Sequence, residues 1–192
     1  NSRLRRLIET IDIANVLTEP ITSSINELLA VSAAKLNSED ASVLVRDGEQ
    51  GDLRFLSATG KVADQLLGMH VPAGKGIAGF VLMSGQPMAV SDVGEDSSFY
   101  AEVDRATGYS TQTILATPLR FKDEIIGVLE FINRRGEPPF TPFTSAELDT
   151  AAVYADAIAP LVNAFESARL LRSLSSKVLT DSGESDLAAM RL

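Results

Sequence analysis

The sequence predicts an α+β domain, in which strands in the middle of the chain are framed by long helices at its two ends. Short β-type runs at residues 41–46 and 53–59 flank a glycine-containing loop, as in a hairpin. A second pair of runs, at residues 113–119 and 125–132, is joined across a short turn. Apolar residues recur at helical spacing before the first pair and after the second. Antiparallel strands with helices placed around them are typical of the α+β class.

The N-terminal part of the chain is predicted to form two helices. The first is amphipathic, with the apolar positions Leu7, Ile8, Ile11, Ala14 and Leu17. Thr18-Glu19-Pro20 then interrupts the pattern, because Thr18 can cap a new helix and Pro20 is tolerated only in a first turn. The second helix ends near Asn37. We expect residues 1–17 to be a separate dimerisation and signalling helix, and the alternative is that this helix packs against the domain's own sheet.

The stretch from Gly74 to Asn133 is predicted to enclose a small-molecule pocket. Gly76 opens an apolar segment that ends at Gly85, which indicates a short helix buried on every side with a left-handed residue after its end. The N-terminus of such a helix directs free N–H groups at any nearby anion. Apolar residues between positions 99 and 106 at helical spacing predict a short helical segment over the cavity.

Glu130 is the residue that most directly indicates a site. Strand alternation places it on the same face as Val128 and Ile132, so that a carboxylate stands on an apolar face. An unpaired buried carboxylate costs several kcal/mol and must be neutralised, bridged or given a ligand. The alternatives are an intramolecular hydrogen bond or an exposed position at the end of the sheet.

The last helix is predicted to begin at a capping box. Thr144 and Glu147 have the spacing in which the threonine hydroxyl and the glutamate carboxylate satisfy each other's backbone N–H groups. Helical spacing continues to about Ser176. We expect residues 177–192, which are largely polar, to form a flexible tail or linker.

The composition excludes several classes of chemistry. The chain of 192 residues has no Cys, which excludes disulfides, thiolate nucleophiles and cysteine metal sites. Its one histidine, His70, cannot form a multi-histidine metal site and is expected to be a solvated or half-buried loop residue. A formal charge of −9 argues against nucleic acid and anionic membranes as partners. No apolar run approaches the roughly 20 residues that span a bilayer, so a cytoplasmic location is expected. The chain begins at Asn, which suggests a piece of a longer protein whose covalently linked output domain is not included.

Four segments resemble the GAF domain family over about residues 18–176. They are DASVLVRD, GKGIAGFVLMSGQPMAVSDV, FYAEVDRATGYSTQTILATPL and IIGVLEFIN. Within the family the chain is most similar to the regulatory domains of cyclic nucleotide phosphodiesterases and cyanobacterial adenylyl cyclases. The resemblance implies a PAS-like fold with a central six-stranded antiparallel sheet, helices on both faces, a pocket roofed by short helices, and long terminal helices that form a parallel homodimer.

The resemblance also implies which residues would contact a cyclic nucleotide, cyclic GMP or cyclic AMP. Carried over position by position, these are Ser42, Ala58, Thr59, Ile77, Ala78, Asp104, Thr107, Thr111 and Glu130. The cyclic nucleotide members carry Asn-Lys followed by Phe-x-x-x-Asp-Glu, in which the lysine and the aspartate form an ion pair. Asn133-Arg134 and Phe140 fit this pattern, but Thr144 and Ser145 replace the two acids. Arg134 is therefore expected to lack its partner, and Ala58-Thr59 replace an aromatic-acid pair found in some members.

Two functions follow as competing expectations. In the first, the chain is a non-catalytic sensory and regulatory domain: a small anionic or nucleotide-like ligand enters the pocket, the segment 95–109 closes over it, and the dimeric terminal helices change their packing. In the second, the chain is a ligand-free dimerisation and protein-interaction module. An enzymatic function is not expected, because the family members that reduce free methionine sulfoxide need cysteines and this chain has none.

Overall fold

The computed structural model describes residues 2–189, without the side chains of residues 2–4, 7 and 179–189. The chain divides into two compact units. One is an α+β unit of residues 25–160, and the other is a helical unit made of residues 1–24 and 161–192. The division predicted from the sequence, at residues 17 and 176, stays a prediction.

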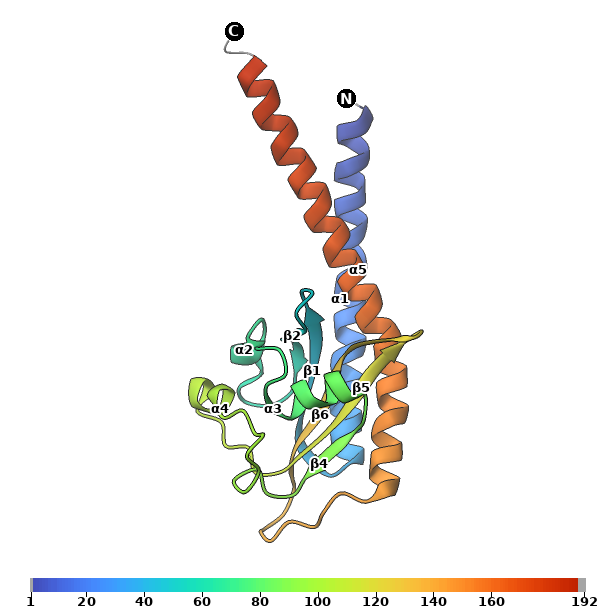
Figure 1. The fold of residues 1–192 in the computed structure, drawn as a ribbon. Coiled ribbons are helices and arrows are strands. Elements are labelled where there is room, and N and C mark those ends of the chain that lie inside the picture. The colour runs from blue at the N-terminus through green and yellow to red at the C-terminus, as the bar shows by residue number, and fades with distance from the viewer. Residues whose placement is uncertain (1, 190–192) are drawn as a thin grey trace. The chain divides into compact units, whose positions relative to one another are not determined.

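The α+β unit is built on one six-stranded sheet with the order β3-β2-β1-β6-β5-β4, in which every neighbouring pair is antiparallel (Figure 1). The strands are β1 Ser38–Asp47, β2 Asp52–Ala58, β3 His70–Val71, β4 Met88–Val90, β5 Ile114–Phe121 and β6 Glu124–Arg134. The predicted antiparallel sheet is confirmed, and β5 and β6 are joined across Lys122-Asp123 as the sequence indicated.

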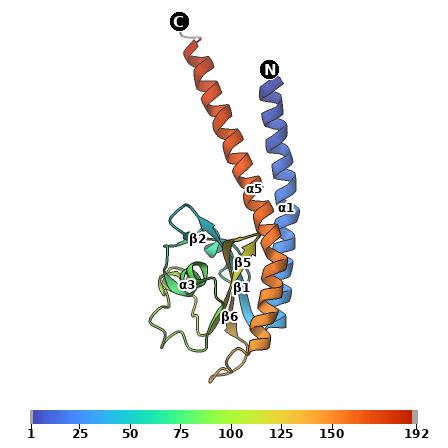
Figure 2. The ribbon, with the colours of Figure 1, turned by 45° about the vertical axis from the view of Figure 1, so that its right-hand side comes forward.

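Helices cover both faces of this sheet. The C-terminal end of α1 (Ser2–Lys35) and the N-terminal end of α5 (Ser145–Ala189) lie on one face (Figure 2). The short helices α2 (Ala63–Leu66), α3 (Gly76–Ser84) and α4 (Glu102–Thr107) belong to the other side. Strand alternation divides β6 between the two: Val128 packs in the cluster that contains residues of α3, and Glu130 shares that face.

Helix α3 confirms most of what its sequence indicated. Gly85 follows the helix in the left-handed region, with a φ of 66°, and its N–H donates to the carbonyl of Val81. A Cβ at Gly79 would lie 2.8 Å from the backbone carbon of Gly74, so the helix presses closely on the preceding loop. The prediction that α3 is buried on every side is wrong, because Phe80 and Met83 are 49% and 76% exposed.

The terminal helices are longer than predicted. Helix α1 continues through Pro20, so the predicted interruption at residues 18–20 is wrong. Thr18 does not cap a new helix but donates from its hydroxyl to the carbonyl of Asn15 inside the continuous one. Helix α5 extends to Ala189, beyond the end predicted near Ser176, and residues 177–189 of the predicted flexible tail are helical. Helix growth is cooperative, so isolated poor helix formers such as Gly183 need not end it. Residues 190–192 lie outside the described residues.

The helical unit has an interface between its two helices and an apolar surface. The guanidinium of Arg172 on α5 donates to Asn15 Oδ1 on α1 at 3.3 Å, and Ala14 and Ala168 are buried. Several large apolar side chains of this unit are nevertheless exposed, namely Ile8, Ile13, Val16, Leu17, Leu170, Leu171, Leu174 and Val178. None of the helices within residues 2–189 is long and apolar enough to cross a membrane.

Candidate functional site

The residues carried over from the family resemblance come together around one cavity of about 70 Å³ in the α+β unit. All nine predicted ligand residues line it: Ser42, Ala58, Thr59, Ile77, Ala78, Asp104, Thr107, Thr111 and Glu130. They come from β1, β2, α3, α4, β6 and the adjoining loops. The structure thus brings these distant positions to a single cavity, and their role as ligand contacts stays a prediction.

Glu130 forms the acidic centre of the cavity. It is 6% exposed, and its carboxyl group accepts one hydrogen bond, from Ser42 Oγ to Oε2 at 3.2 Å. Burial raises the pKa of Glu130 to about 7, and the hydrogen bond from Ser42 only partly opposes this effect. The predicted carboxyl group on an apolar face is therefore buried, and the hydrogen bond with Ser42 gives it a neutral partner rather than a cation.

Three of the predicted ligand residues form hydrogen bonds within α4 and the loop that follows it. Asp104 Oδ2 accepts the backbone N–H of Thr111 at 2.7 Å, and Oδ1 accepts the Thr111 hydroxyl at 2.8 Å. The hydroxyl of Thr107 donates to the carbonyl of Val103 at 2.9 Å. These side chains hold α4 and the loop after it together as one piece. We call residues 95–109, which contain α4, the lid.

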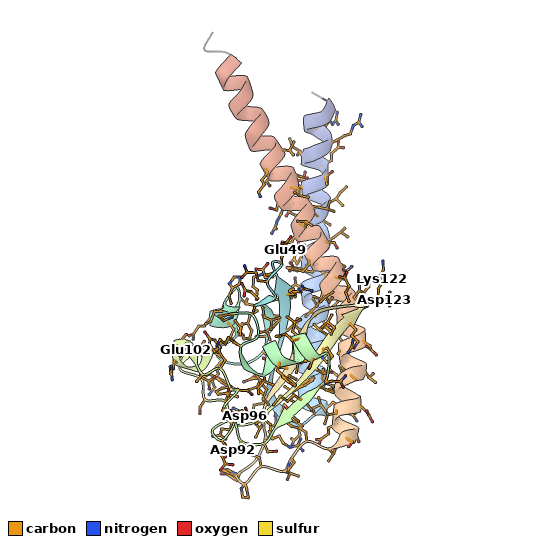
Figure 3. The ribbon with its side chains drawn as sticks, in the orientation of Figure 1. Glu49, Asp92, Asp96, Glu102, Lys122 and Asp123 are labelled. Carbon is orange, nitrogen blue, oxygen red and sulfur yellow. The ribbon has the colours of Figure 1, made fainter. Side chains whose placement is uncertain are left out.

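Other acids on α4 and in the connector before it do not line the cavity. Figure 3 shows Glu102 on α4, with Asp92 and Asp96 along the connector that leads to it. The two aspartates fold that connector, since Asp92 accepts the N–H of Gly94 at 2.9 Å and Asp96 accepts the N–H of Ser98 at 2.8 Å. These carboxylates therefore shape the connector and do not line the cavity.

Tyr109 fastens the lid to the sheet. Its hydroxyl donates to Asp40 Oδ2 at 2.9 Å and accepts from Asn133 Nδ2 at 3.3 Å. Burial, together with the neighbouring carboxylate of Asp40, raises the pKa of the Tyr109 phenol, so that it stays a donor. Asn133 also donates to the carbonyl of Ser110 at 2.9 Å and accepts the N–H of Gln112 at 2.7 Å. Sequence reasoning missed Asp40 and Tyr109 as cavity residues, although both lie in the quoted family segments.

The start of α3 supplies polar groups of the opposite sign. Ile77 and Ala78 are in the first turn, where backbone N–H groups have no acceptor within the helix, and both line the cavity. Lys75, directly before the helix, also lines it. A Cβ at Gly76 would lie 2.9 Å from Cβ of Tyr100, so the lid closes directly against this turn.

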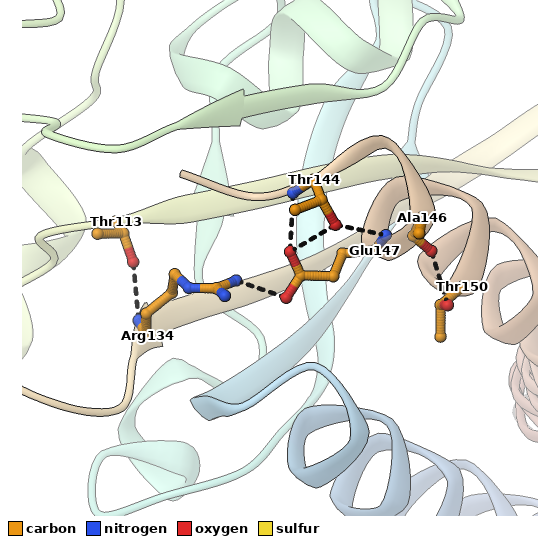
Figure 4. A network of polar contacts seen from close by, with 6 residues as sticks. All are labelled: Thr113, Arg134, Thr144, Ala146, Glu147 and Thr150. Carbon is orange, nitrogen blue, oxygen red and sulfur yellow. Dashed lines mark hydrogen bonds and ion pairs between the residues drawn. The ribbon is translucent and has the colours of Figure 1, made fainter. Parts of the chain in front are cut away.

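The expectation that Arg134 lacks a partner is wrong. Its guanidinium forms an ion pair with Glu147 Oε1 at 2.8 Å (Figure 4). The same guanidinium lies 4.5 Å from the ring centre of Phe143. Glu147 also completes the predicted capping box: its Oε2 accepts the N–H of Thr144 at 2.7 Å, and its own N–H donates to the Thr144 hydroxyl at 3.3 Å. Burial alone would raise the pKa of Glu147, but the hydrogen bonds from Thr144 and Arg134 outweigh it and lower the pKa.

The structure offers little for metal chemistry in the part of the chain it describes. No group of three or more potential metal-ligating side chains occurs among these residues. His70 lies on β3, where it pairs with Arg54, and not in the predicted loop. Its Nε2 is 2.9 Å from Asp47 Oδ2, and its side chain is 54% exposed. Its setting is that of a surface pair, and it does not line the cavity.

Comparison with known sequences agrees with the fold. A sequence model of the GAF domain matches residues 14–161. Over 80 residues the chain is 38% identical to a probable 3',5'-cyclic phosphodiesterase, pde-5, of Caenorhabditis elegans. That match covers 42% of this chain and 11% of the phosphodiesterase, so the chain corresponds to a small part of that relative's length.

Solved structures share the same architecture. One is the GAF domain of a phosphoenolpyruvate-protein phosphotransferase from Coxiella burnetii, with a TM-score of 0.66 and 13% identity over 85% of this chain and 96% of that one. Another is a type II free methionine-R-sulfoxide reductase from Thermoplasma acidophilum, with a TM-score of 0.63 and 20% identity over 78% of this chain and 96% of that one. At these identities the likeness concerns the fold alone.

Proposed function

Because the chain belongs to the GAF domain family, we propose that it is a non-catalytic sensory domain that binds a small organic molecule in the cavity and signals through its terminal helices. Domains of this family are generally of the sensory or regulatory type, although the Thermoplasma protein with this fold is named as a reductase. A cytoplasmic location and a covalently linked output domain are part of the same proposal.

The observation that carries this proposal is the cavity around Glu130. Side chains from both halves of the sheet and from the helices above it converge there, and its carboxyl group is buried with one neutral hydrogen-bond donor. A buried acid in a polar-and-apolar cavity is a feature of binding sites, because a ligand can supply the hydrogen bonds that the protein does not. Packing alone does not require an acid at this position.

Cyclic GMP and cyclic AMP are the first ligands to consider. The relative named as a cyclic phosphodiesterase and the free N–H groups of Ile77 and Ala78, which suit a phosphate, both favour them. The size of the cavity opposes them, since 70 Å³ is well below the roughly 300–1,000 Å³ of typical ligand pockets. A nucleotide would therefore have to displace the lid outward, which requires separation of Tyr109 from Asp40 or of Tyr100 from Gly76.

Signal output is proposed to run through a parallel homodimer. The helical unit exposes large apolar side chains on both of its helices, including Val16, which is 72% exposed, and Leu171, which is 52% exposed. Exposed apolar surfaces on a pair of helices can pack against the same surface of a second copy and form a four-helix interface. A ligand changes the output only if it binds one arrangement of the helices more tightly than the other.

Thermal unfolding with a ligand panel tests the binding function. The panel contains cyclic and linear nucleotides and amino acids. A ligand at a hundredfold excess over its dissociation constant should stabilise the domain by about 2.7 kcal/mol. Ser42→Ala and Thr111→Ala, which alter the cavity wall at different elements, should reduce that stabilisation. A panel without any stabilising member at concentrations far above plausible dissociation constants would count against the proposal.

The alternative function is a ligand-free dimerisation and interaction module, and the small cavity favours it. Asp104, Thr107 and Thr111 are already satisfied by hydrogen bonds within the chain and so need no ligand. This alternative requires that the dimer form equally well without any small molecule and that Glu130→Ala leave dimerisation intact. Copurification of a bound small molecule would rule it out.

A further inference from the structure

The cavity has two carboxyl groups on one wall. Asp40 on β1 and Glu130 on β6 belong to neighbouring strands: Ser42 is directly opposite Glu130, and Asp40 is opposite Ile132. Asp40 and Ser42 are two residues apart, so they share a face of the sheet, and Glu130 shares it too. Diagonal neighbours of this kind are roughly 7–8 Å apart at their backbones. Both carboxyl groups therefore belong to one side of the cavity, which both residues line.

Neither carboxyl group has a cationic partner among the described residues. Asp40 accepts from the hydroxyl of Tyr109 at 2.9 Å and from that of Thr59 at 3.4 Å, and Glu130 accepts from the hydroxyl of Ser42. The second carboxyl oxygen of Glu130, Oε1, has no hydrogen-bond partner in the part of the chain that the structure describes. Lys75, the cation on the cavity wall, forms an ion pair with neither acid there.

Much of the remaining cavity wall is apolar, although Asp104, Thr107 and Thr111 of the covering segment also line it. Its apolar side chains include Phe55, Val71, Ile77, Phe99, Val103 and Ile114. In such surroundings an unmet acceptor weighs more than in water, because the low local dielectric strengthens each electrostatic interaction. A donor or a positive charge placed against Glu130 would be stabilised, whereas a second negative charge would be repelled by both acids.

We propose that the cavity selects ligands whose buried end carries N–H donors or positive charge, such as an amine or an amidine, directed at Glu130 and Asp40. This inference rests on the proposed binding function and names the ligand class for that site. A carboxylate or phosphate on the same ligand is restricted to the side formed by Lys75 and the first turn of α3. A purely anionic small ligand, as the helix N-terminus alone would favour, does not fit the sheet side of the cavity.

Three probes of nearly equal shape test the inference: benzamidine, benzamide and benzoate, which carry a charge of +1, 0 and −1. Their binding to the full chain is measured at pH 8 from the backbone amide chemical shifts of cavity residues. Benzamidine should bind about tenfold more tightly than benzamide, the effect of one charge-assisted hydrogen bond, and benzoate should bind most weakly. In Glu130→Gln, benzamidine should lose most of its advantage over benzamide.

Asp123→Asn is the matched control, because Asp123 is an exposed acid in the β5–β6 turn, outside the cavity. It should leave the order of the three probes and the tenfold ratio unchanged. Benzoate binding as tightly as benzamidine, or a benzamidine preference that survives Glu130→Gln, would overturn the proposed ligand class and leave the binding function standing. The binding function and this inference would both be contradicted if none of the probes shifted the resonances of cavity residues and no member of the ligand panel raised the thermal stability.

Discussion

The hydroxyl of Ser42 donates to Glu130 Oε2 at 3.2 Å across the central strand pair of the sheet, where the two residues are directly opposite each other. One neutral donor is a weak partner for a carboxylate that is 6% exposed. The carboxyl group of Glu130 would therefore be stabilised by a proton, a hydrogen-bond donor or a cation placed against it in the cavity. Several consequences of this and of the neighbouring contacts can be measured.

The first prediction concerns the pH dependence of stability. The pKa of Glu130 is about 7 in the folded chain, against an ordinary value of 4.5 that applies to the unfolded chain. Between these two pH values, the folded chain holds a proton that the unfolded chain has lost. The stabilising contribution of this group is fully present below about pH 4.5 and is lost as the pH rises through 7. The difference amounts to about 3 kcal/mol of unfolding free energy.

Glu130→Gln isolates this effect. Urea unfolding of the wild type and the variant between pH 4.5 and 8 should show that the variant gains on the wild type by up to about 3 kcal/mol as the pH rises. Glu102→Gln, an exposed acid on α4, serves as the control and should follow the wild type. A constant difference between Glu130→Gln and the wild type across this range would show that Glu130 titrates in the ordinary range.

The second prediction concerns the ion pair of Arg134 and Glu147. Both side chains are largely buried, at 12% and 22% exposed, and the pair joins the end of β6 to the start of α5. Glu147→Gln keeps an acceptor for the N–H of Thr144 but removes the charge, and should lower the unfolding free energy by about 1–2 kcal/mol. A double-mutant cycle with Arg134→Met should give a coupling energy of about 1 kcal/mol, and additive effects would mean that the pair contributes nothing.

The third prediction concerns the attachment of the lid. Tyr109→Phe removes the hydroxyl that joins Asp40 and Asn133. It should speed amide hydrogen exchange of residues 105–113, which include the end of the lid, by about threefold to tenfold, the effect of one lost hydrogen bond. Tyr100→Phe is the matched control, because the structure gives the Tyr100 hydroxyl no hydrogen bond among the described residues. Equal exchange in the two variants would show that Tyr109 does not restrain the lid.

The fourth prediction concerns the parallel dimer. The chain has no Cys, so a single cysteine introduced at Val16 can form a disulfide only with a second copy. Equivalent positions meet in a parallel pair of helices, and mild oxidation of Val16→Cys should therefore give a covalent dimer. Glu49→Cys, in the exposed β1–β2 loop, should stay monomeric under the same conditions. A dimer by sedimentation that Val16→Cys does not crosslink would point to another arrangement.

The strands, the face on which Glu130 lies and the start of α5 could be predicted because their determinants are local. Alternation on β6 placed Glu130 on the cavity face, and the capping box of Thr144 and Glu147 follows from their spacing alone. The family segments supplied the other cavity positions. Each of these inferences depends on residues a few positions apart or on a motif of fixed length.

The errors came from competition between local preference and the rest of the structure. Pro20 disfavours a helix interior, yet α1 continues through it. The replacement of two motif acids suggested that Arg134 had no partner, but Glu147, one turn into α5, provides one. Tyr109 was not identified as a cavity residue, because its contacts with Asp40 and Asn133 bring together three distant segments and leave no pattern in the sequence.

Native mass spectrometry of freshly purified protein shows whether the cavity holds a small molecule. We expect a population of wild-type chains with the added mass of an organic ligand, which is absent or much reduced in Glu130→Ala. The same spectra report whether dimers persist in the variant. Wild-type chains without added mass, together with no stabilisation by any member of the ligand panel, would contradict ligand binding in the cavity.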